Sequence, residues 1–162
     1  MSSQLTATFH ASAMSTPTAD QIRARMRDDY GNDLTAKVDD GTGPCRHCLQ
    51  YAKPGDRLIL FSYRPFEKPA LYQEVGPVFI HADGCERYAG SEMIPPAFAA
   101  RPLILRPYTS EHAIADSQVF APAGRAPEMA AALFENPDVA YLHVRSVSRG
   151  CYLFRIERFS AL

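Results

Sequence analysis

Four residues that could bind a metal ion occur in two short segments, and their spacing constrains the fold more than any other feature of the chain. Cys45 and Cys48 form a Cys-x-x-Cys motif in a loop opened by Gly43-Pro44, and His81 and Cys85 follow at the end of a later apolar run. A zinc ion prefers four nitrogen and sulfur ligands in a tetrahedron, and a Cys-x-x-Cys turn presents two thiolates to one point. The sequence therefore predicts a structural zinc site whose ligands are Cys45, Cys48, His81 and Cys85.

These cysteines have two other interpretations. Reduced thiols also pack in protein cores as small apolar groups that bind no ligand. Alternatively, Cys45 and Cys48 could form a redox pair, because the intervening His47 would lower a thiol pKa. Thioredoxin-like proteins place that motif at the start of a long helix, whereas here Pro54-Gly55 follows too soon for one. The sequence therefore disfavours redox catalysis and leaves structural zinc and inert packing as alternatives.

Cys85 occupies a position that could alter the reactivity of its thiol. Asp83 and Glu86 have the spacing of a helix N-cap and its third helical residue, so we expect a short helix to begin at Asp83. The partial positive charge at a helix N-terminus would favour the Cys85 thiolate. Cys85 is then either a better metal ligand or a mildly reactive thiol, with an ordinary cysteine as the third alternative.

The composition is that of an ordinary globular protein with little overall charge. The chain has 162 residues, 46% of them hydrophobic, so it can bury a core as one domain without needing metal or disulfides. The formal net charge of −1 argues against the basic field that drives nucleic-acid binding. The sequence shows no signal-peptide pattern and no apolar run long enough for a membrane span. We therefore expect a cytoplasmic protein with reduced thiols and no membrane or nucleic-acid partner.

Alternating apolar residues and turn signals predict several short strands and few helices. The expected strands cover residues 5–9, 34–38, 57–63, 78–81, 103–107, 114–120, 140–145 and 151–156. Besides the short helix from Asp83, the expected helices cover residues 18–30, 97–100 and 127–134. Because most strands follow one another without a long helix between them, the predicted fold class is α+β. We expect a single domain over residues 1–162 with a largely antiparallel sheet and two or three short helices, in which residues 1–15 are poorly ordered or form a weak strand.

A second set of residues could form a pocket for a small anion. Arg64 follows the strand 57–63 beside two aromatic residues, and Arg46, His143 and Arg155 are further candidates. A guanidinium forks well onto a carboxylate or phosphate, so these side chains could bind such a group without a metal. The alternative is that the arginines lie on the surface or pair across strands, which the absence of a glycine-rich phosphate loop favours.

Several short motifs resemble one bacterial family. The motifs are Gly43-Pro44-Cys45-Arg46, Pro54-Gly55, Gly76-Pro77-Val78-Phe79, Tyr141-x-His143 and Gly150-Cys151-Tyr152. From about Leu34 onward, the chain resembles the bacterial domain-of-unknown-function 1203 (DUF1203) family. The resemblance implies a cytosolic, single-domain protein with cysteines at the positions of Cys45 and Cys151, and it implies no particular activity. It also implies that a site using Cys48, His81 and Cys85 belongs to a subgroup of the family.

One function is preferred, and one rival is kept. The preferred function is a binding or interaction module, stabilised by a structural zinc that fixes the Pro44 loop to the strand ending at His81. The rival is an enzyme or small-anion-binding protein without metal, whose pocket lies near Cys45, Arg46, Arg64 and His143. Whether the protein is an enzyme stays open. A homo-oligomer could form through an exposed edge at the strand 103–107, and the sequence indicates no other partner.

Overall fold

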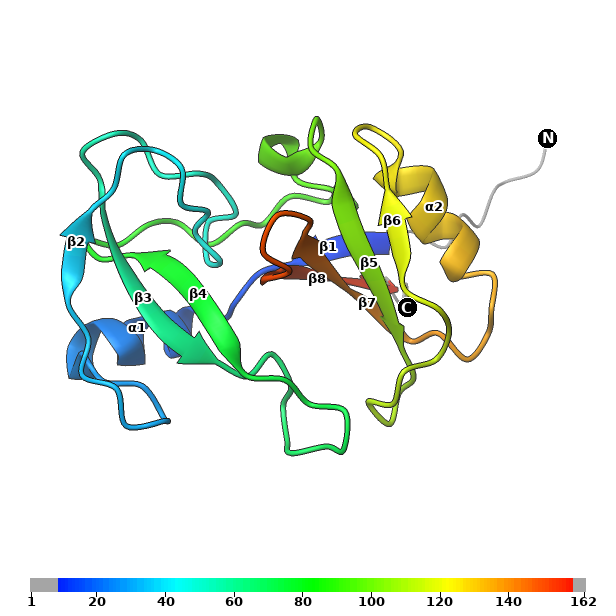
Figure 1. The fold of residues 1–162 in the computed structure, drawn as a ribbon, viewed down its shortest axis with the longest axis horizontal. Coiled ribbons are helices and arrows are strands. Elements are labelled where there is room, and N and C mark those ends of the chain that lie inside the picture. The colour runs from blue at the N-terminus through cyan, green and yellow to red at the C-terminus, as the bar shows by residue number, and fades with distance from the viewer. Residues whose placement is uncertain (1–8, 159–162) are drawn as a thin grey trace.

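The structure, a computed structural model, describes residues 9–158, which form two antiparallel sheets at opposite ends of the molecule (Figure 1). The larger sheet has five strands in the order β1-β8-β7-β5-β6, and the smaller has three in the order β2-β3-β4. The strands of the larger sheet are β1 (Phe9–Ser12), β5 (Leu103–Tyr108), β6 (Val119–Ala121), β7 (Tyr141–Ser146) and β8 (Tyr152–Arg158). The strands of the smaller sheet are β2 (Ala36–Val38), β3 (Arg57–Tyr63) and β4 (Gly76–His81). The α+β fold with antiparallel sheets is therefore confirmed.

The larger sheet buries one face against helix α2 (Ala126–Leu133). Leu105 of β5 lies opposite Val144 of β7, and both pack in the same core as Ala130 of α2. Successive strand residues point to opposite faces, so His143 lies on the other face of the sheet. That second face looks toward the smaller sheet, and it carries polar and aromatic side chains.

The smaller sheet packs against helix α1 (Thr16–Arg25). Ile59 and Phe61 of β3 form a buried cluster with Ile80 of β4 and Ile22 of α1. Cys45 is part of the same cluster, so the Cys-x-x-Cys motif belongs to the core beneath this sheet.

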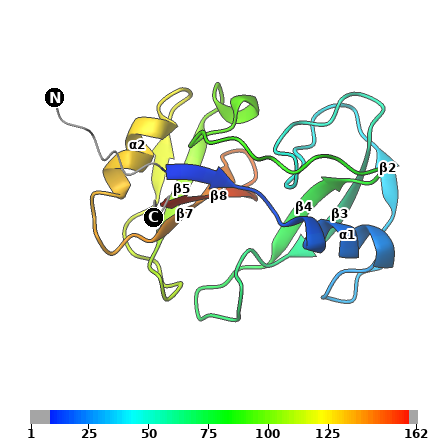
Figure 2. The same ribbon diagram turned by 180° about the vertical axis from the view of Figure 1, so that it is seen from behind.

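The loop around Cys45 ties the two sheets together. The Arg46 N–H donates to the Phe79 carbonyl of β4 over 2.9 Å. The Arg46 Nε donates to the Tyr152 carbonyl of β8 over 2.8 Å, and its Nη1 donates to the Pro44 carbonyl. Because Arg46 is only 3% exposed, its guanidinium is a buried tie between the sheets. The chain also passes directly from one sheet to the other where β1 leads into α1 (Figure 2).

Helix α1 begins earlier and ends earlier than the sequence predicts. The Ser15 hydroxyl accepts a hydrogen bond from the Thr18 N–H and so caps the helix. The helix therefore begins at Thr16 and not at the predicted Thr18. Met26 takes a left-handed φ of 49° and ends the helix before Gly31 is reached. The Asp28 carboxylate then accepts N–H groups of the following residues, which holds the chain in a turn that competes with further helix.

Two strand predictions need correction. Strand β5 lies inside the larger sheet rather than at its edge, because β6 pairs with its first residues, Leu103–Leu105. Pro107 is tolerated because it lies beyond this paired stretch. The edge proposed for pairing with a second copy is therefore covered. The predicted strand 114–120 overlaps β6 only at its end, and residues 5–8 of the predicted first strand lie outside the described residues.

Apart from the short helix expected to begin at Asp83, the remaining predicted elements are present with small shifts at their ends. β3 has the predicted bounds, and β7 and β8 form the predicted hairpin with register Leu142 to Ile156. The prolines beyond Met93 open the short helix η1 (Pro96–Phe98), and Pro127 lies in the first turn of α2.

Candidate metal centre

The Cys-x-x-Cys motif lies in a tight turn that docks against strand β4. The Leu49 N–H donates to the Cys45 carbonyl over 3.0 Å, which closes the turn around both thiols. Gly43 lets the chain approach β3 closely, since a Cβ at this position would lie 2.5 Å from Leu58 Cδ1. Cys45 and Cys48 are both buried. The turn therefore places two thiols in the interior, next to the end of β4.

The second half of the site lies in a turn, and the predicted helix from Asp83 is not formed. His81 is the last residue of β4, and Gly84 takes a φ of 93°, which a helix cannot accommodate. The Asp83 carboxylate accepts a hydrogen bond from Arg57 Nε over 3.1 Å, so it is not free to cap a helix. Cys85 follows in a segment without regular secondary structure. The expectation that a helix N-terminus activates Cys85 is therefore wrong.

The two halves bring four ligand atoms to one place. The three cysteine sulfurs and one ring nitrogen of His81 all lie within 4.8 Å of one another. Cys45 Sγ lies 3.8 Å from Cys85 Sγ, and Cys48 Sγ lies 3.5 Å from His81 Nδ1. Zinc bond lengths of about 2.3 Å to sulfur and about 2.0–2.1 Å to nitrogen give tetrahedron edges of about 3.8 Å and about 3.5 Å. The cluster is therefore compatible with metal binding.

Asp56 orients the histidine of this cluster. His81 Nε2 lies 3.1 Å from Asp56 Oδ2, at the far side of the ring from Cys48. A proton on Nε2 that is donated to this carboxylate leaves the Nδ1 lone pair directed at the sulfurs. A carboxylate that fixes the tautomer in this way is the usual outer partner of a metal-bound histidine.

Two side chains surround Cys85. Arg23 Nη2 lies 3.5 Å from Cys85 Sγ, and Arg23 Nε donates to the His81 carbonyl over 2.8 Å. His47 Nδ1 lies 3.1 Å from Cys85 Sγ, while its Nε2 lies 2.9 Å from Thr16 Oγ1. The Thr16 hydroxyl can donate to Nε2, which leaves the Nδ1–H of His47 to donate to the sulfur. Cys85 Sγ therefore lies within reach of two nitrogen donors, one from Arg23 of helix α1 and one from His47, whose ring Thr16 of the same helix orients.

The three thiols also share hydrogen bonds with one another. The bonds from Cys48 and Cys85 to Cys45 lower the pKa of the Cys45 thiol. The bonds of Cys48 to Cys45 and Cys85 raise the pKa of Cys48, and the bond to Cys45 raises the pKa of Cys85 to about 11. The backbone N–H of His81 also donates to Cys45 Sγ over 3.4 Å. These hydrogen bonds therefore favour the thiolate at Cys45 over those at Cys48 and Cys85. The remaining cysteine, Cys151, lies at the β7–β8 turn outside this cluster.

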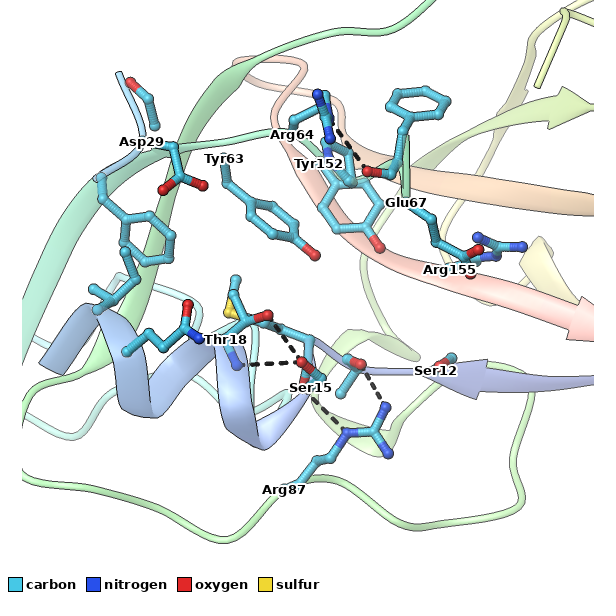
Figure 3. A pocket seen from close by; sticks show the side chains of 18 of the residues that line it. Ser12, Ser15, Thr18, Asp29, Tyr63, Arg64, Glu67, Arg87, Tyr152 and Arg155 are labelled. Atoms are coloured by element: carbon cyan, nitrogen blue, oxygen red, sulfur yellow. Dashed lines mark hydrogen bonds between the residues drawn. The ribbon is translucent and has the colours of Figure 1, made fainter. Parts of the chain in front are cut away.

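The residues predicted to form an anion pocket do not all lie together: two are buried in the core, and two line a cavity. Arg46 is the buried tie between the sheets, and burial lowers its pKa to about 10. His143 is fully buried, and its ring nitrogens have no hydrogen-bond partner among the described residues. Burial, with the nearby Arg155, lowers the pKa of His143 well below its ordinary value, so the ring is neutral. Arg64 and Arg155 line a cavity between the two sheets (Figure 3).

Sequence reasoning did not find the residues around the metal ligands. Asp56 reads as part of the turn before β3, and Arg23 reads as part of a solvated helix face. For His47 the sequence indicates only a neighbour that lowers a thiol pKa. No local pattern signals these roles, because each contact joins segments far apart in the chain. The sequence could offer one hint for Asp56. This carboxylate comes just before β3, which pairs with β4, the strand that ends at His81.

The fold and the site define an α+β protein with a Cys3His cluster that is compatible with metal binding. The family model described as "Protein of unknown function (DUF1203)" matches residues 42–158, so the chain belongs to the DUF1203 family. The four cluster residues lie inside the matched range, whereas Thr16 and Arg23 precede it. No curated protein and no solved structure matches the chain. Within residues 9–158, neither α-helix has the length and apolar character needed to cross a bilayer.

Proposed function

We propose that the protein is a binding module whose fold is stabilised by one structural zinc ion, held by Cys45, Cys48, His81 and Cys85. The observation that carries the proposal is the separation of the ligand atoms, 3.8 Å between two sulfurs and 3.5 Å between a sulfur and the His81 nitrogen. These are the edge lengths expected for a zinc tetrahedron. Zinc is preferred over harder divalent ions because thiolate and imidazole ligands suit it.

The same ligand set supports a structural role for the ion. Catalytic zinc sites leave one coordination position to water or substrate, whereas four protein ligands close the sphere. Three thiolates around a dication carry one surplus negative charge, and the Arg23 guanidinium beside Cys85 can offset it. An ion at this point would join the Cys45 turn to the end of β4. It would also hold Arg46, the buried tie to the larger sheet.

Metal content tests this proposal. Full-length protein purified without chelator should contain about one equivalent of zinc, and removal of the ion should lower the melting temperature. A zinc content below a tenth of an equivalent, in protein that folds cooperatively and has reduced thiols, would contradict the proposal. A disulfide between Cys45 and Cys85 in the purified protein would favour thiol chemistry instead.

The fourth cysteine provides a matched control. Cys48→Ser should lose most of the zinc, whereas Cys151→Ser should keep it, since Cys151 lies outside the cluster. Substituting Co²⁺ into the wild-type protein gives a second measurement that does not depend on whether Cys48→Ser folds. Strong thiolate-to-cobalt absorption is expected, and its absence would count against coordination by three sulfurs.

A further inference from the structure

A cavity of about 650 Å³ lies between the two sheets, away from the candidate metal centre. Its walls come from β1 and the start of α1, from β3, and from β8 (Figure 3). None of the four cluster residues lines it. Its volume falls within the range of roughly 300–1,000 Å³ that is usual for small-molecule sites.

Three hydroxyl groups along this cavity have unused hydrogen-bonding capacity. Within residues 9–158, the hydroxyls of Ser12, Tyr63 and Tyr152 have no hydrogen-bond partner. Figure 3 shows both phenol oxygens pointing into the open space above Ser15 and Thr18. Burial raises the pKa of both phenols, so each keeps the proton that it can donate. The hydroxyls come from both sheets and converge on one space.

Arg155 adds a cationic donor to this group. Its Nε pairs with Glu157 Oε1 over 2.8 Å, and its guanidinium stacks 3.7 Å above the centre of the Tyr141 ring. Its two terminal nitrogens have no hydrogen-bond partner in the described part of the chain. Ser12 lies directly opposite Arg155 in the β1–β8 ladder, so both side chains lie on the same face. The guanidinium is thus held in place, while its outer edge stays free.

The charges and rings around the cavity narrow the class of ligand. Three arginines and three carboxylates line it, namely Arg64, Arg87, Arg155, Asp29, Glu67 and Glu157. The Arg87 guanidinium is bound to backbone carbonyls, and Asp29 and Glu67 are exposed. The groups inside the cavity are therefore mostly hydrogen-bond donors, which suit a ligand that accepts hydrogen bonds. The neighbouring carboxylates disfavour a dianion such as phosphate, and the flat faces of Tyr63 and Tyr152 suit a planar apolar body.

We propose that this cavity binds a small planar monocarboxylate. The carboxylate would accept hydrogen bonds from the Arg155 guanidinium and from the Tyr152 and Tyr63 hydroxyls, while the planar body packs between the tyrosine rings. This site goes beyond the proposed zinc centre and uses none of its ligands. Failure of one proposal is therefore distinguishable from failure of the other when zinc content is measured in the same sample.

Calorimetric titration of full-length protein with benzoate tests the site, with benzamide as the neutral match of the same shape. Benzoate should bind saturably with a dissociation constant of about 1 mM, and benzamide should bind about tenfold or more weakly, because it cannot form the charge-assisted bond. Absence of saturable benzoate binding would overturn the proposal. Equal affinity for benzamide, or tighter binding of inorganic phosphate, would overturn the assignment of a monocarboxylate.

Substitutions of Tyr152 and Arg155 test whether benzoate binds in this cavity. Tyr152→Phe removes one hydroxyl and keeps the ring, so it should weaken benzoate binding about fivefold or more, with the melting temperature and zinc content unchanged. Tyr72→Phe, on an exposed loop outside the cavity, is the matched control and should bind like wild type. Arg155→Gln should abolish the preference for benzoate over benzamide. Unaltered benzoate affinity in both Tyr152→Phe and Arg155→Gln would place any binding elsewhere.

Discussion

His81 Nε2 lies 3.1 Å from Asp56 Oδ2, while His81 Nδ1 faces Cys48 Sγ at 3.5 Å. The imidazole thus has one nitrogen committed to a carboxylate and the other directed at the sulfurs. The two contacts come from different segments: Asp56 lies in the turn before β3, and Cys48 lies in the Cys-x-x-Cys turn against β4. This relationship turns an isolated histidine at a strand end into an oriented metal ligand.

Asp56→Asn should weaken zinc binding without removing a ligand. The amide cannot accept the Nε2 proton with the same strength, so the affinity for zinc should fall about 10- to 100-fold. Competition with a chelator of known affinity measures this change. Asp83→Asn is the control, because Asp83 pairs with Arg57 and not with a ligand. Equal affinity in Asp56→Asn and wild type would show that Asp56 does not support the histidine.

Arg23→Gln should weaken zinc binding through Cys85. The substitution removes the charge 3.5 Å from the sulfur and the hydrogen bond to the His81 carbonyl. We expect an affinity several-fold, up to about 10-fold, lower than that of wild type. Arg25→Gln on the same helix is the control, since the described structure gives Arg25 no contact with the cluster. The proposed charge compensation is wrong if both variants release zinc at the wild-type rate and bind it equally tightly.

Asp28 should stabilise the protein in a pH-dependent way. Its carboxylate accepts the N–H groups of Tyr30, Asn32 and Ser62, which joins the turn after α1 to the end of β3. Although burial acts to raise it, the hydrogen bond from the Asn32 side-chain amide, together with these backbone bonds, lowers the Asp28 pKa from 3.8 to about 2. Because the folded pKa is lower, the stabilisation is complete above the unfolded value and is lost as pH falls through about 2.

Asp28→Asn should therefore lower the free energy of unfolding by about 2 kcal/mol at neutral pH. Urea unfolding measures this difference, which should shrink between about pH 4 and about pH 2. Asp33→Asn, at a side chain that is 88% exposed, should change stability by less than about 0.5 kcal/mol. A difference between wild type and Asp28→Asn that stays constant down to the lowest pH would contradict the role of the charge.

Substitution by leucine should cost less stability at His143 than at His112. His143 packs against the Phe66, Tyr108 and Tyr152 rings, and its ring nitrogens have no partner in the described structure. His143→Leu should cost less than about 1 kcal/mol, because it removes polar atoms that are buried without hydrogen bonds. His112 Nδ1 lies 2.7 Å from the Tyr141 hydroxyl, so His112→Leu should cost about 1–3 kcal/mol.

Thermal and urea unfolding of these two variants measure the contrast. A large loss in His143→Leu would show that its nitrogens do have partners, such as ordered water. That result would also revive the rival prediction, which placed His143 beside a functional pocket.

Local patterns in the sequence determined most of the secondary structure. Alternation of apolar residues defined β3 and the β7–β8 hairpin, because each such strand has one face in a core and the other facing outward or toward polar groups. Prolines marked η1 and the first turn of α2. The helix expected at Asp83 failed because Arg57, a residue of another strand, takes the carboxylate that would have capped it.

The four side chains with the chemistry of a zinc site can be recognised without a structure, because ligand type and spacing within each half are local properties. Three features could not be recognised in this way: the two halves meet, Asp56 and Arg23 complete their surroundings, and Arg46 is a buried tie between the sheets. These outcomes depend on the docking of segments distant in the chain. Such docking is decided by the packing of the two cores and the crossing of β1 into α1, and no short stretch of sequence encodes it.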